Sequence, residues 1–406
     1  MSEMNVGCLP GLMKVTVAVM LAVTLAMTGC VSNKEAEVRY VPYAPAEHEM
    51  REITSFELMS EIKTGWNLGN SFDSRGFGLG AESAWGNPAT TYEMIRAVAA
   101  AGFDAIRVPV TWENQVDPAP DYTVNEMWLD RVEEVVGYVL STGMYCIINT
   151  HHEDNIFPTD EKLKENSAFL SLLWKQIAER FKNYNHKLIF EGMNEPRLKD
   201  TEHEWNGGTP EARAVVNKLN GEFVKAVRST GGNNRTRHLM VPTYAASVET
   251  HALKDLADYF DTLWEHGGNG KDKLIASVHA YTPNVFALNP KGTGTWNSGA
   301  FEQDIDWVFD RLQRQFLDNG IPVIMGECGA VDKGDLESRV AWTMYYFGVA
   351  RKYGIPAFWW DNGVFNARGP DDDTTEIFGM LNRHEARFVF PEVIEAIMNP
   401  TDMTDS

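Results

Sequence analysis

Two glutamates close two apolar runs that lie far apart in the chain. Glu195 belongs to the segment Phe190–Pro196 (FEGMNEP), and Glu327 belongs to Ile324–Gly329 (IMGECG). Hydrolysis of a glycosidic bond uses two such carboxyl groups, one as acid and base and the other as nucleophile. Either glutamate alone is better explained as a solvated residue in a strand-ending turn. Their meaning therefore depends on the elements that position them.

The chain alternates between short apolar runs, rich in β-branched and aromatic residues, and longer segments with helical spacing. The helical segments include residues 94–101, 129–139, 169–181, 211–228, 307–317 and 338–353. The predicted strands are Gly65–Ser71, Ala105–Trp112, Tyr145–His152, Leu188–Pro196, His238–Tyr244, Ile275–Pro283, Val323–Gly329 and Ala357–Gly363. The pattern is thus eight strands, most of them followed by a helix.

The predicted strands are continuous apolar runs rather than alternating ones. Strands of this kind are buried on both faces, which indicates a parallel sheet covered by helices. Eight such units fit an α/β fold of the (β/α)8 TIM barrel type, with one catalytic domain over residues 53–400. An open doubly wound sheet is the second choice, but no Gly-rich phosphate loop follows the first strand.

Polar residues gather where the predicted strands end, which is where a TIM barrel carries its reactive groups. They are Arg107 on the second strand, His151 and His152 on the third, Asn194 and Glu195 on the fourth, His279 and Tyr281 on the sixth, Glu327 on the seventh and Trp360 on the eighth. One polar strand end is most often a satisfied core residue. Six strands together favour an active site.

These motifs resemble glycoside hydrolase family five, and most of all its subfamily four of endo-acting β-glucanases. The resemblance covers nearly everything from Ile53 to Met398. It rests on Gly65–Asp73, Ala84–Pro88, Ile106–Trp112, Asn149–His152, Phe190–Arg197, Val278–Pro283, Gly326–Glu327 and Phe358–Gly363. Cys328 departs from the aromatic or bulky residue common in the family. Strand alternation directs it away from the barrel mouth, so we expect altered packing and intact chemistry.

The resemblance implies roles for the two glutamates. Arg107 lies beside Glu327 in the family, which makes Glu327 the nucleophile, with the Tyr281 hydroxyl as a second donor. Glu195 is then the acid/base. We expect partial burial and repulsion from ionised Glu327 to raise the pKa of Glu195. The two carboxyl groups of a retaining enzyme lie about 5 to 5.5 Å apart.

The resemblance also implies residues that bind the sugar. Asn194 is similar to the family residue that bonds the 2-hydroxyl, and His151 and His279 resemble the histidines that hold the sugar and the acid/base. His152 adjoins them, and Trp360 presents a flat face for a pyranose ring. Its alternative is a core aromatic at the barrel mouth. Asn70 and Trp85 are weaker candidates for more distant subsites.

His151-His152-Glu153-Asp154 also has the composition of a metal site. Neighbouring residues on a strand point to opposite faces, so both histidines do not readily bind one ion. We therefore expect no metal and no cofactor, and activity that survives exhaustive chelation.

The 406-residue chain carries a formal net charge of -21. This charge repels phosphate backbones, so nucleic acid is not expected as a partner and a neutral β-glucan is favoured. We expect a monomer. Membrane contact is expected only through an N-terminal lipid anchor.

The N-terminus predicts export. Val15–Met27 is an apolar run of signal-peptide length, and it ends in small residues before Cys30, as in a bacterial lipoprotein signal. Residues 1–29 are then the signal peptide, Cys30 the lipidated residue, 30–52 a flexible tether and 401–406 a tail. The protein is expected in the periplasm or on the cell surface. A cleaved signal with an incidental cysteine, and hence secretion, is the alternative.

The expected function is a retaining endo-β-1,4-glucan hydrolase that acts on cellulose-like glucan, mixed-linkage β-glucan or xyloglucan. Two alternatives share the barrel. One is a β-mannan hydrolase, and the other is a surface lipoprotein that binds polysaccharide without cleaving it. The presence of Glu195, Glu327 and Arg107 disfavours the second alternative.

Overall fold

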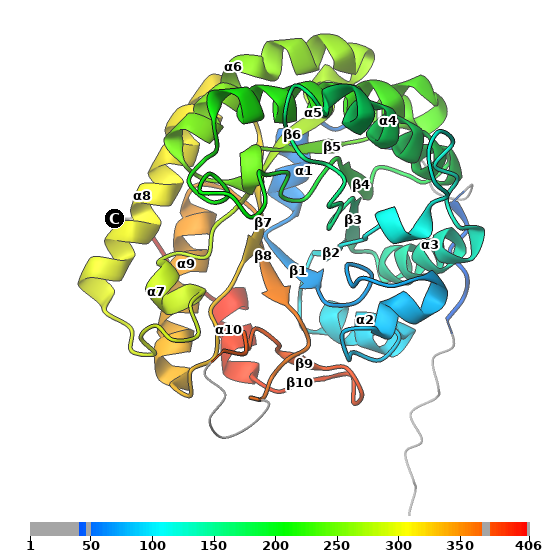
Figure 1. The fold of residues 1–406 in the computed structure, drawn as a ribbon. Helices are drawn as coiled ribbons and strands as arrows, with labels where there is room; N and C mark the ends of the chain where they lie inside the picture. The colour runs from blue at the N-terminus through cyan, green and yellow to red at the C-terminus, as the bar shows by residue number, and fades with distance from the viewer. Residues whose placement is uncertain (1–39, 46–49, 368–373, 404–406) are drawn as a thin grey trace, which may run out of the picture. The chain divides into compact units, whose positions relative to one another are not determined.

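A computed structural model of the protein describes residues 40–45, 50–367 and 374–403. Within these ranges, eight parallel strands close into a barrel in chain order, and helices surround it (Figure 1). β1 completes the closure by pairing with β8, with Asn67 opposite Trp360. The prediction of a (β/α)8 TIM barrel is confirmed.

All eight predicted strands are present, but each ends sooner than its apolar run. They are β1 (Thr64–Leu68), β2 (Ala105–Val108), β3 (Tyr145–Asn149), β4 (Leu188–Glu191), β5 (Leu239–Pro242), β6 (Leu274–His279), β7 (Val323–Cys328) and β8 (Ala357–Asp361). The runs continue because residues beyond the strands, such as Val110 and Trp112, are also buried. His151, His152, Asn194 and Glu195 thus lie in loops, not on strands.

Helices cover the outside of the barrel. They are α2 (Tyr92–Ala100), α3 (Glu126–Ser141), α4 (Leu163–Arg180), α5 (Pro210–Ser229), α6 (Thr250–Gly267), α7 (Asn284–Ala287), α8 (Ser298–Gln315), α9 (Leu336–Lys352) and α10 (Pro391–Met398). Short 3-10 turns are η2 (Gly78–Ser83), η3 (Glu113–Gln115), η4 (Gly232–Arg235), η5 (Tyr244–Ala246), η6 (Gly268–Lys273) and η7 (Leu317–Asn319). A small hairpin of β9 (Leu381–Asn382) and β10 (Arg387–Phe388) precedes α10.

Strand alternation separates two apolar cores. Cys146 and Ile148 of β3 pack toward the helices, whereas Ile147 belongs to a smaller cluster inside the barrel. The helix α1 (Ser55–Glu61), which the sequence analysis did not predict, adds Leu58 and Met59 to this inner cluster. The inner cluster includes the first residues of several strands, so α1 closes the end of the barrel opposite the mouth.

The barrel interior becomes polar above the inner apolar cluster. Asn67, Arg107, Asn149, Glu191 and Ser277 lie one inward position further along their strands, and each is fully buried. Register places Asn67 beside Arg107 and Asn149 beside Glu191. A buried polar layer therefore separates the apolar floor from the residues at the mouth.

The packed domain extends beyond the expected limits of 53 and 400. Tyr40 packs edge-on against Tyr138 of α3, with ring centroids 4.6 Å apart, and its hydroxyl occupies the space that a side chain at Gly137 would fill. At the other end, the Thr401 amide donates to the Met344 carbonyl. The sequence analysis assigned these residues to the tether and the tail because they show no periodic pattern.

The predicted signal peptide over 1–29 and Cys30 lie outside the described residues. Among the helices that the structure describes, none combines the length and apolar character needed to cross a bilayer. Cys146 and Cys328 are buried thiols, as expected.

Candidate active site

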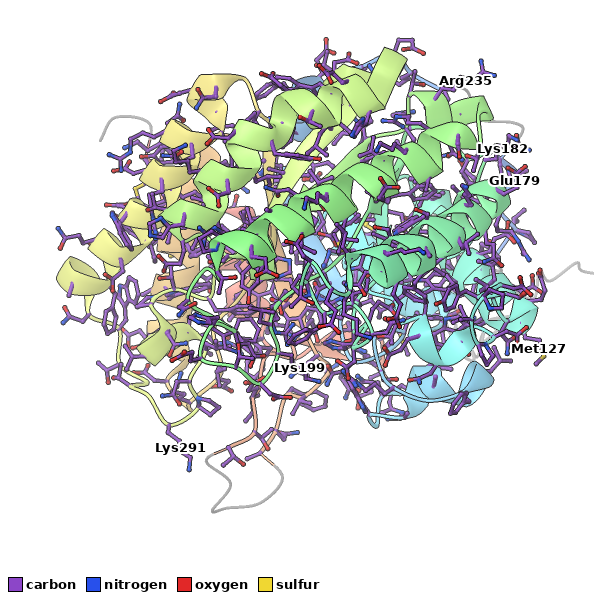
Figure 2. The ribbon with its side chains drawn as sticks, turned by 45° about the horizontal axis from the view of Figure 1, so that its top comes forward. Met127, Glu179, Lys182, Lys199, Arg235 and Lys291 are labelled. Carbon is purple, nitrogen blue, oxygen red and sulfur yellow. The ribbon has the colours of Figure 1, made fainter. Side chains whose placement is uncertain are left out.

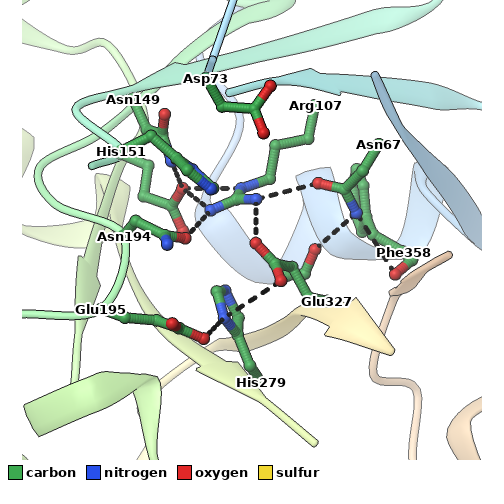
Figure 3. Close-up of polar contacts among 12 residues, drawn as sticks. Asn67, Asp73, Arg107, Asn149, His151, Asn194, Glu195, His279, Glu327 and Phe358 are labelled. Atoms are coloured by element: carbon green, nitrogen blue, oxygen red, sulfur yellow. Dashed lines mark hydrogen bonds and ion pairs between the residues drawn. The ribbon is translucent and has the colours of Figure 1, made fainter. Parts of the chain in front are cut away.

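Glu327 lies within β7, and two fixed donors hold its carboxylate. Arg107 Nη1 donates to Oε1 at 2.8 Å (Figure 3). The Tyr281 hydroxyl donates to Oε2 at 2.8 Å. Burial, together with the charge of Glu327, raises the pKa of Tyr281 well above its ordinary value, so its proton stays on the hydroxyl. The side chain of Glu327 is only 7% exposed. The structure thus brings Arg107, Tyr281 and Glu327 together as expected.

Glu195 reaches the same site from the loop after β4. Its Oε1 lies 2.9 Å from His279 Nδ1, and its Oε2 lies 3.6 Å from Arg197 Nη1. Burial raises the pKa of Glu195, but the hydrogen bond and charge of His279, joined by the charge of Arg197, outweigh it. The pKa is therefore lowered, and the expectation that it is raised was wrong. The sequence showed the second carboxylate but not these cationic neighbours.

His279 connects the two glutamates. Its Nδ1 lies 3.7 Å from Glu327 Oε2 as well as 2.9 Å from Glu195 Oε1. Burial disfavours the imidazolium, but the charges of Glu327 and Glu195 outweigh burial and raise the pKa of His279 above its ordinary value. One carboxylate oxygen of Glu195 and one of Glu327 lie within 4.8 Å of each other. Two carboxyl groups this close can act on the same bond.

Arg107 organises the floor of the site. Besides Glu327, its guanidinium donates to Asn67 Oδ1 at 2.9 Å, Asn194 Oδ1 at 2.7 Å and Glu191 Oε2 at 2.7 Å. The bond to Asn194 fixes the orientation of that amide. Its Nδ2 group therefore remains available as a donor.

The remaining candidates line the mouth. The ring of Trp360 stacks parallel to His151, with centroids 5.8 Å apart, and fits over Gly69, where a Cβ atom would collide with the indole. Burial lowers the pKa of His151 well below its ordinary value and that of His152 to about 4, so both are neutral donors or acceptors. Trp85 is 42% exposed and its ring lies 5.7 Å from His152.

Asn70 lies in the loop directly after β1. It adopts a left-handed backbone conformation with φ of 55°. Its backbone N–H donates to Asp73 Oδ2, and its backbone carbonyl accepts from Asn87 Nδ2. Both bonds are made by the backbone of Asn70, so a sugar contact of its side chain stays a prediction.

The model of the cellulase family, glycosyl hydrolase family 5, matches residues 68–366, which is most of the chain. The chain belongs to glycosyl hydrolase family 5. It is therefore a glycoside hydrolase.

This family 5 hydrolase is 44% identical over 350 residues to the cellulase/esterase CelE of Acetivibrio thermocellus, covering 86% of this chain and 41% of that protein. A GH5-4 broad specificity endoglucanase from Ruminococcus champanellensis, solved with bound cellotriose, matches with TM-score 0.79 and 41% identity over 86% of this chain and 100% of that one. The xyloglucan-specific endo-β-1,4-glucanase XEG5A, from a metagenomic library, matches with TM-score 0.78 and 39% identity over 85% and 98%. The chain thus spans less than half the length of CelE.

Two groups of side chains in the described part of this family 5 hydrolase have ligand atoms within 4.8 Å of one another: Asp73, His151 and His152, and Glu195, His279 and Glu327. The argument that His151 and His152 point to opposite faces was wrong. Both residues follow the end of β3, where strand alternation no longer applies. The second group consists of residues already engaged with one another. The expectation of a metal-free hydrolase stays a prediction.

Sequence reasoning missed several residues that shape the site. Glu191 and Ser277 lie inside strands, where an apolar run hides a polar residue that faces inward. Arg197 follows the Asn-Glu-Pro motif and was quoted with it, but it received no role. Its guanidinium pairs with Glu204 at 2.9 Å and stacks over the exposed ring of Trp205 at 4.3 Å. Lys199 lies on the same loop (Figure 2). It pairs with Asp154 at 3.0 Å.

Proposed function

We propose that the protein is a retaining endo-β-1,4-glucanase, with Glu327 as nucleophile and Glu195 as acid/base. The observation that carries the proposal is the short separation of the two carboxylates, with oxygens within 4.8 Å. Retaining glycosidases have carboxyl groups about 5 to 5.5 Å apart, whereas inverting enzymes leave roughly 6.5 to 9.5 Å for a water molecule. The asymmetry of their partners supports the assignment of roles.

In the first step, Glu327 attacks the anomeric carbon and the glycosidic oxygen leaves with a proton. Arg107 and Tyr281 hold the Glu327 carboxylate in position, because each donates a hydrogen bond to one of its two oxygens. Asn194 Nδ2 is free to bond the sugar 2-hydroxyl, a contact that strengthens as positive charge develops at the ring. Trp360 supplies the flat face beneath that ring.

The proton for the leaving group is held by the pair of Glu195 and His279. The pKa of His279 is raised by Glu327 and Glu195, whereas that of Glu195 is lowered, so the two groups share one proton across 2.9 Å. Attack neutralises Glu327 and removes an anion that holds the proton on His279. The pair then delivers its proton through Glu195 as the bond breaks. Water later returns a proton to the pair when it attacks the glycosyl-enzyme.

We propose β-1,4-linked glucans as substrates, which include cellulose-like glucan, mixed-linkage β-glucan and xyloglucan. The relatives support this class, since one binds cellotriose and another is xyloglucan-specific. Product analysis on xyloglucan, mixed-linkage glucan, carboxymethylcellulose and mannan tests it. Faster turnover of mannan than of every glucan would assign the alternative specificity.

The stereochemical outcome tests the mechanism separately. Proton NMR of a short digest should show the β-anomer first, followed by slow mutarotation. An α-anomer as the first product would contradict Glu327 as a nucleophile.

We also propose that the mature protein is anchored through a lipid on Cys30 and works as a monomer outside the cytoplasm. The sequence of the N-terminal segment supports the anchor. Labelling of cells with a fatty-acid analogue should mark the wild-type protein and not the Cys30→Ser variant. Equal labelling of both proteins would contradict the anchor, and light scattering of the enzyme without its lipid checks the monomer.

A further inference from the structure

Glu191 is a buried carboxylate that the proposed reaction does not use. It points inward from β4 in the polar layer beneath the two catalytic glutamates, and its side chain has no exposed surface. Its Oε2 accepts from Arg107 Nε at 2.7 Å and from Asn149 Nδ2 at 3.0 Å. Its Oε1 accepts from the Ser277 hydroxyl at 2.6 Å. Side chains from three other strands therefore donate to this one carboxylate.

Arg107 therefore lies between two carboxylates. Its Nη1 faces Glu327, while Nε and Nη2 face Glu191. Burial disfavours the cation, but the charges of Glu191 and Glu327, in that order of size, raise the pKa of Arg107 above its ordinary value. One buried guanidinium thus contacts two carboxylates. The negative charge of Glu191 therefore reduces the net electrostatic stabilisation that Glu327 receives from this part of the site.

We propose that Glu191 is a positioning residue that limits how strongly Arg107 holds Glu327, and so sets the balance between attack and release by the nucleophile. This inference rests on the proposed role of Glu327. A carboxylate bound tightly by a guanidinium is a weaker nucleophile, because its charge is already stabilised. The same tight bond makes it a better leaving group when the glycosyl-enzyme is hydrolysed. Glu191 moves the enzyme toward faster attack and slower release.

Removal of the Ser277 hydroxyl should have the opposite effect on Glu327 to removal of the Glu191 charge. Ser277 lies on β6 one inward position below His279, and Gly326 leaves room for both, since a Cβ there would sit 3.2 Å from Ser277 Oγ and 3.1 Å from His279 Nε2. The Ser277 hydroxyl stabilises part of the charge of Glu191. Without it, Glu191 depends more on Arg107, and Glu327 then feels less positive charge.

The other groups around Glu327 are few. Ionisable neighbours are Arg107 on β2, His279 on β6, Tyr281 beyond β6 and Glu195 beyond β4, while Cys328 is adjacent on β7 with a strongly raised pKa. β1 and β8 contribute Asn67 and Trp360, which do not titrate. We expect Glu191→Gln and Ser277→Ala to retain all of these side chains, because neither variant replaces any of them.

The test compares kcat/KM across pH for wild type, Glu191→Gln and Ser277→Ala on a soluble β-glucan. The acidic limb of the profile reports loss of the ionised nucleophile. Glu191→Gln should move this limb to lower pH by roughly one unit, the effect of one neighbouring charge. Ser277→Ala should move it to higher pH by a few tenths of a unit, about the effect of one lost hydrogen bond. A shift of both variants in the same direction, or of neither, would overturn the inference.

A second measurement follows the covalent step itself. A dinitrophenyl 2-deoxy-2-fluoro-β-cellobioside should lose dinitrophenolate as Glu327 bonds to its anomeric carbon, giving an adduct visible by mass spectrometry. Inactivation of Glu191→Gln should be slower, by about tenfold, and its reactivation faster. A structural defect would slow both steps, and that outcome counts against the inference.

Two further variants separate the outcomes. Glu82→Gln removes another buried carboxylate, one paired with Arg131 at 3.0 Å outside the barrel, and it should leave the profile unmoved. Glu191→Asp retains the charge and should restore the acidic limb toward wild type. If wild type itself forms no adduct and cleaves no glucan, the proposed function fails. If wild type reacts but the Glu191→Gln and Ser277→Ala shifts are absent, only this inference fails.

Discussion

Glu327 and Glu195 lie close together at the mouth of the barrel, but the protein holds them in different ways. Glu327 is part of β7, and its donors, Arg107 and Tyr281, keep their protons near neutral pH. Glu195 lies four residues beyond the end of β4, and its nearest partner is His279, whose pKa is raised because the charges of Glu327 and Glu195 outweigh burial.

The difference teaches how one barrel separates two identical side chains into two roles. A nucleophile needs constant charge and a fixed position, which a strand and non-titrating donors provide. A proton carrier needs a partner that can give and receive a proton, which His279 provides. Partners, not burial, distinguish the two glutamates, since both are mostly buried, with side chains 16% exposed for Glu195 and 7% for Glu327.

Removing each carboxylate in turn tests this comparison most severely. Glu327→Gly and Glu195→Ala should each lower kcat/KM on glucan, the former by on the order of 10⁴-fold or more. With an activated aryl cellobioside as substrate, added azide should restore turnover by both variants. The two variants should give glycosyl azides of opposite anomeric configuration. Azide occupying the place of Glu327 gives the α-glycosyl azide, and azide attacking the glycosyl-enzyme of Glu195→Ala gives the β-azide. The same anomer from both variants would remove the distinction.

His279→Ala tests the shared proton. The pair keeps its proton to higher pH than an isolated carboxyl group, because the pKa of His279 is raised. Without the imidazole, Glu195 must hold the proton alone and loses it at lower pH. We expect the basic limb of the kcat/KM profile to move to lower pH and kcat/KM at the optimum to fall by roughly 10²-fold. A basic limb that stays in place would show that Glu195 alone carries the proton.

Arg197→Met should move the basic limb the other way. Arg197 lowers the pKa of Glu195 from a distance of 3.6 Å, and its loss strengthens proton binding by the pair. The shift is small, roughly half a pH unit upward, because Arg197 also pairs with Glu204 and is partly exposed. Arg180→Met, at a paired arginine on α4, is the matched control and should not change the profile. A downward shift for Arg197→Met would contradict the sign.

The fold was predictable because parallel strands buried on both faces leave continuous apolar runs that one sequence displays. Runs such as Ala105–Trp112 continue past the strand end, because residues after the strand also pack in the core, so strand ends were not predictable. Helix α1 was missed because a single short amphipathic helix has no repeat to reveal it. Tyr40 was missed for a similar reason, since isolated aromatic residues in a polar segment carry no period.

The sequence predicted those site residues that belong to recognisable motifs at the ends of strands. Glu195, Glu327, Arg107 and Tyr281 were found in this way. Glu191 was not, because a charged residue inside an apolar strand shows its meaning only when Arg107 from another strand is seen beside it. The pKa of Glu195 was misjudged for the same reason. Charge balance depends on contacts between loops that are distant in sequence.

The smallest predicted effect is on stability, and it concerns an ion-pair cluster that joins the loops beyond β3 and β4. Asp154, beyond β3, pairs with Arg75 and, at 3.0 Å, with Lys199 beyond β4. Hydrogen bonding and charge from Arg75, with help from Lys199, lower the pKa of Asp154 to about 2. An unfolded aspartate titrates near about 3.9, so this stabilisation is complete above that pH and disappears as pH falls toward about 2.

Because the side chains of this cluster are 37 to 40% exposed, water screens the pairing and the contribution is less than about 1 kcal/mol. Asp154→Asn should therefore lower Tm at pH 7 by about 2 °C or less, and the difference should shrink below about pH 4 and vanish near about pH 2. High salt at pH 7 should also reduce it. A difference that persists in acid would show that Asp154 acts through packing, and that the Glu195 side is held as rigidly as the Glu327 side.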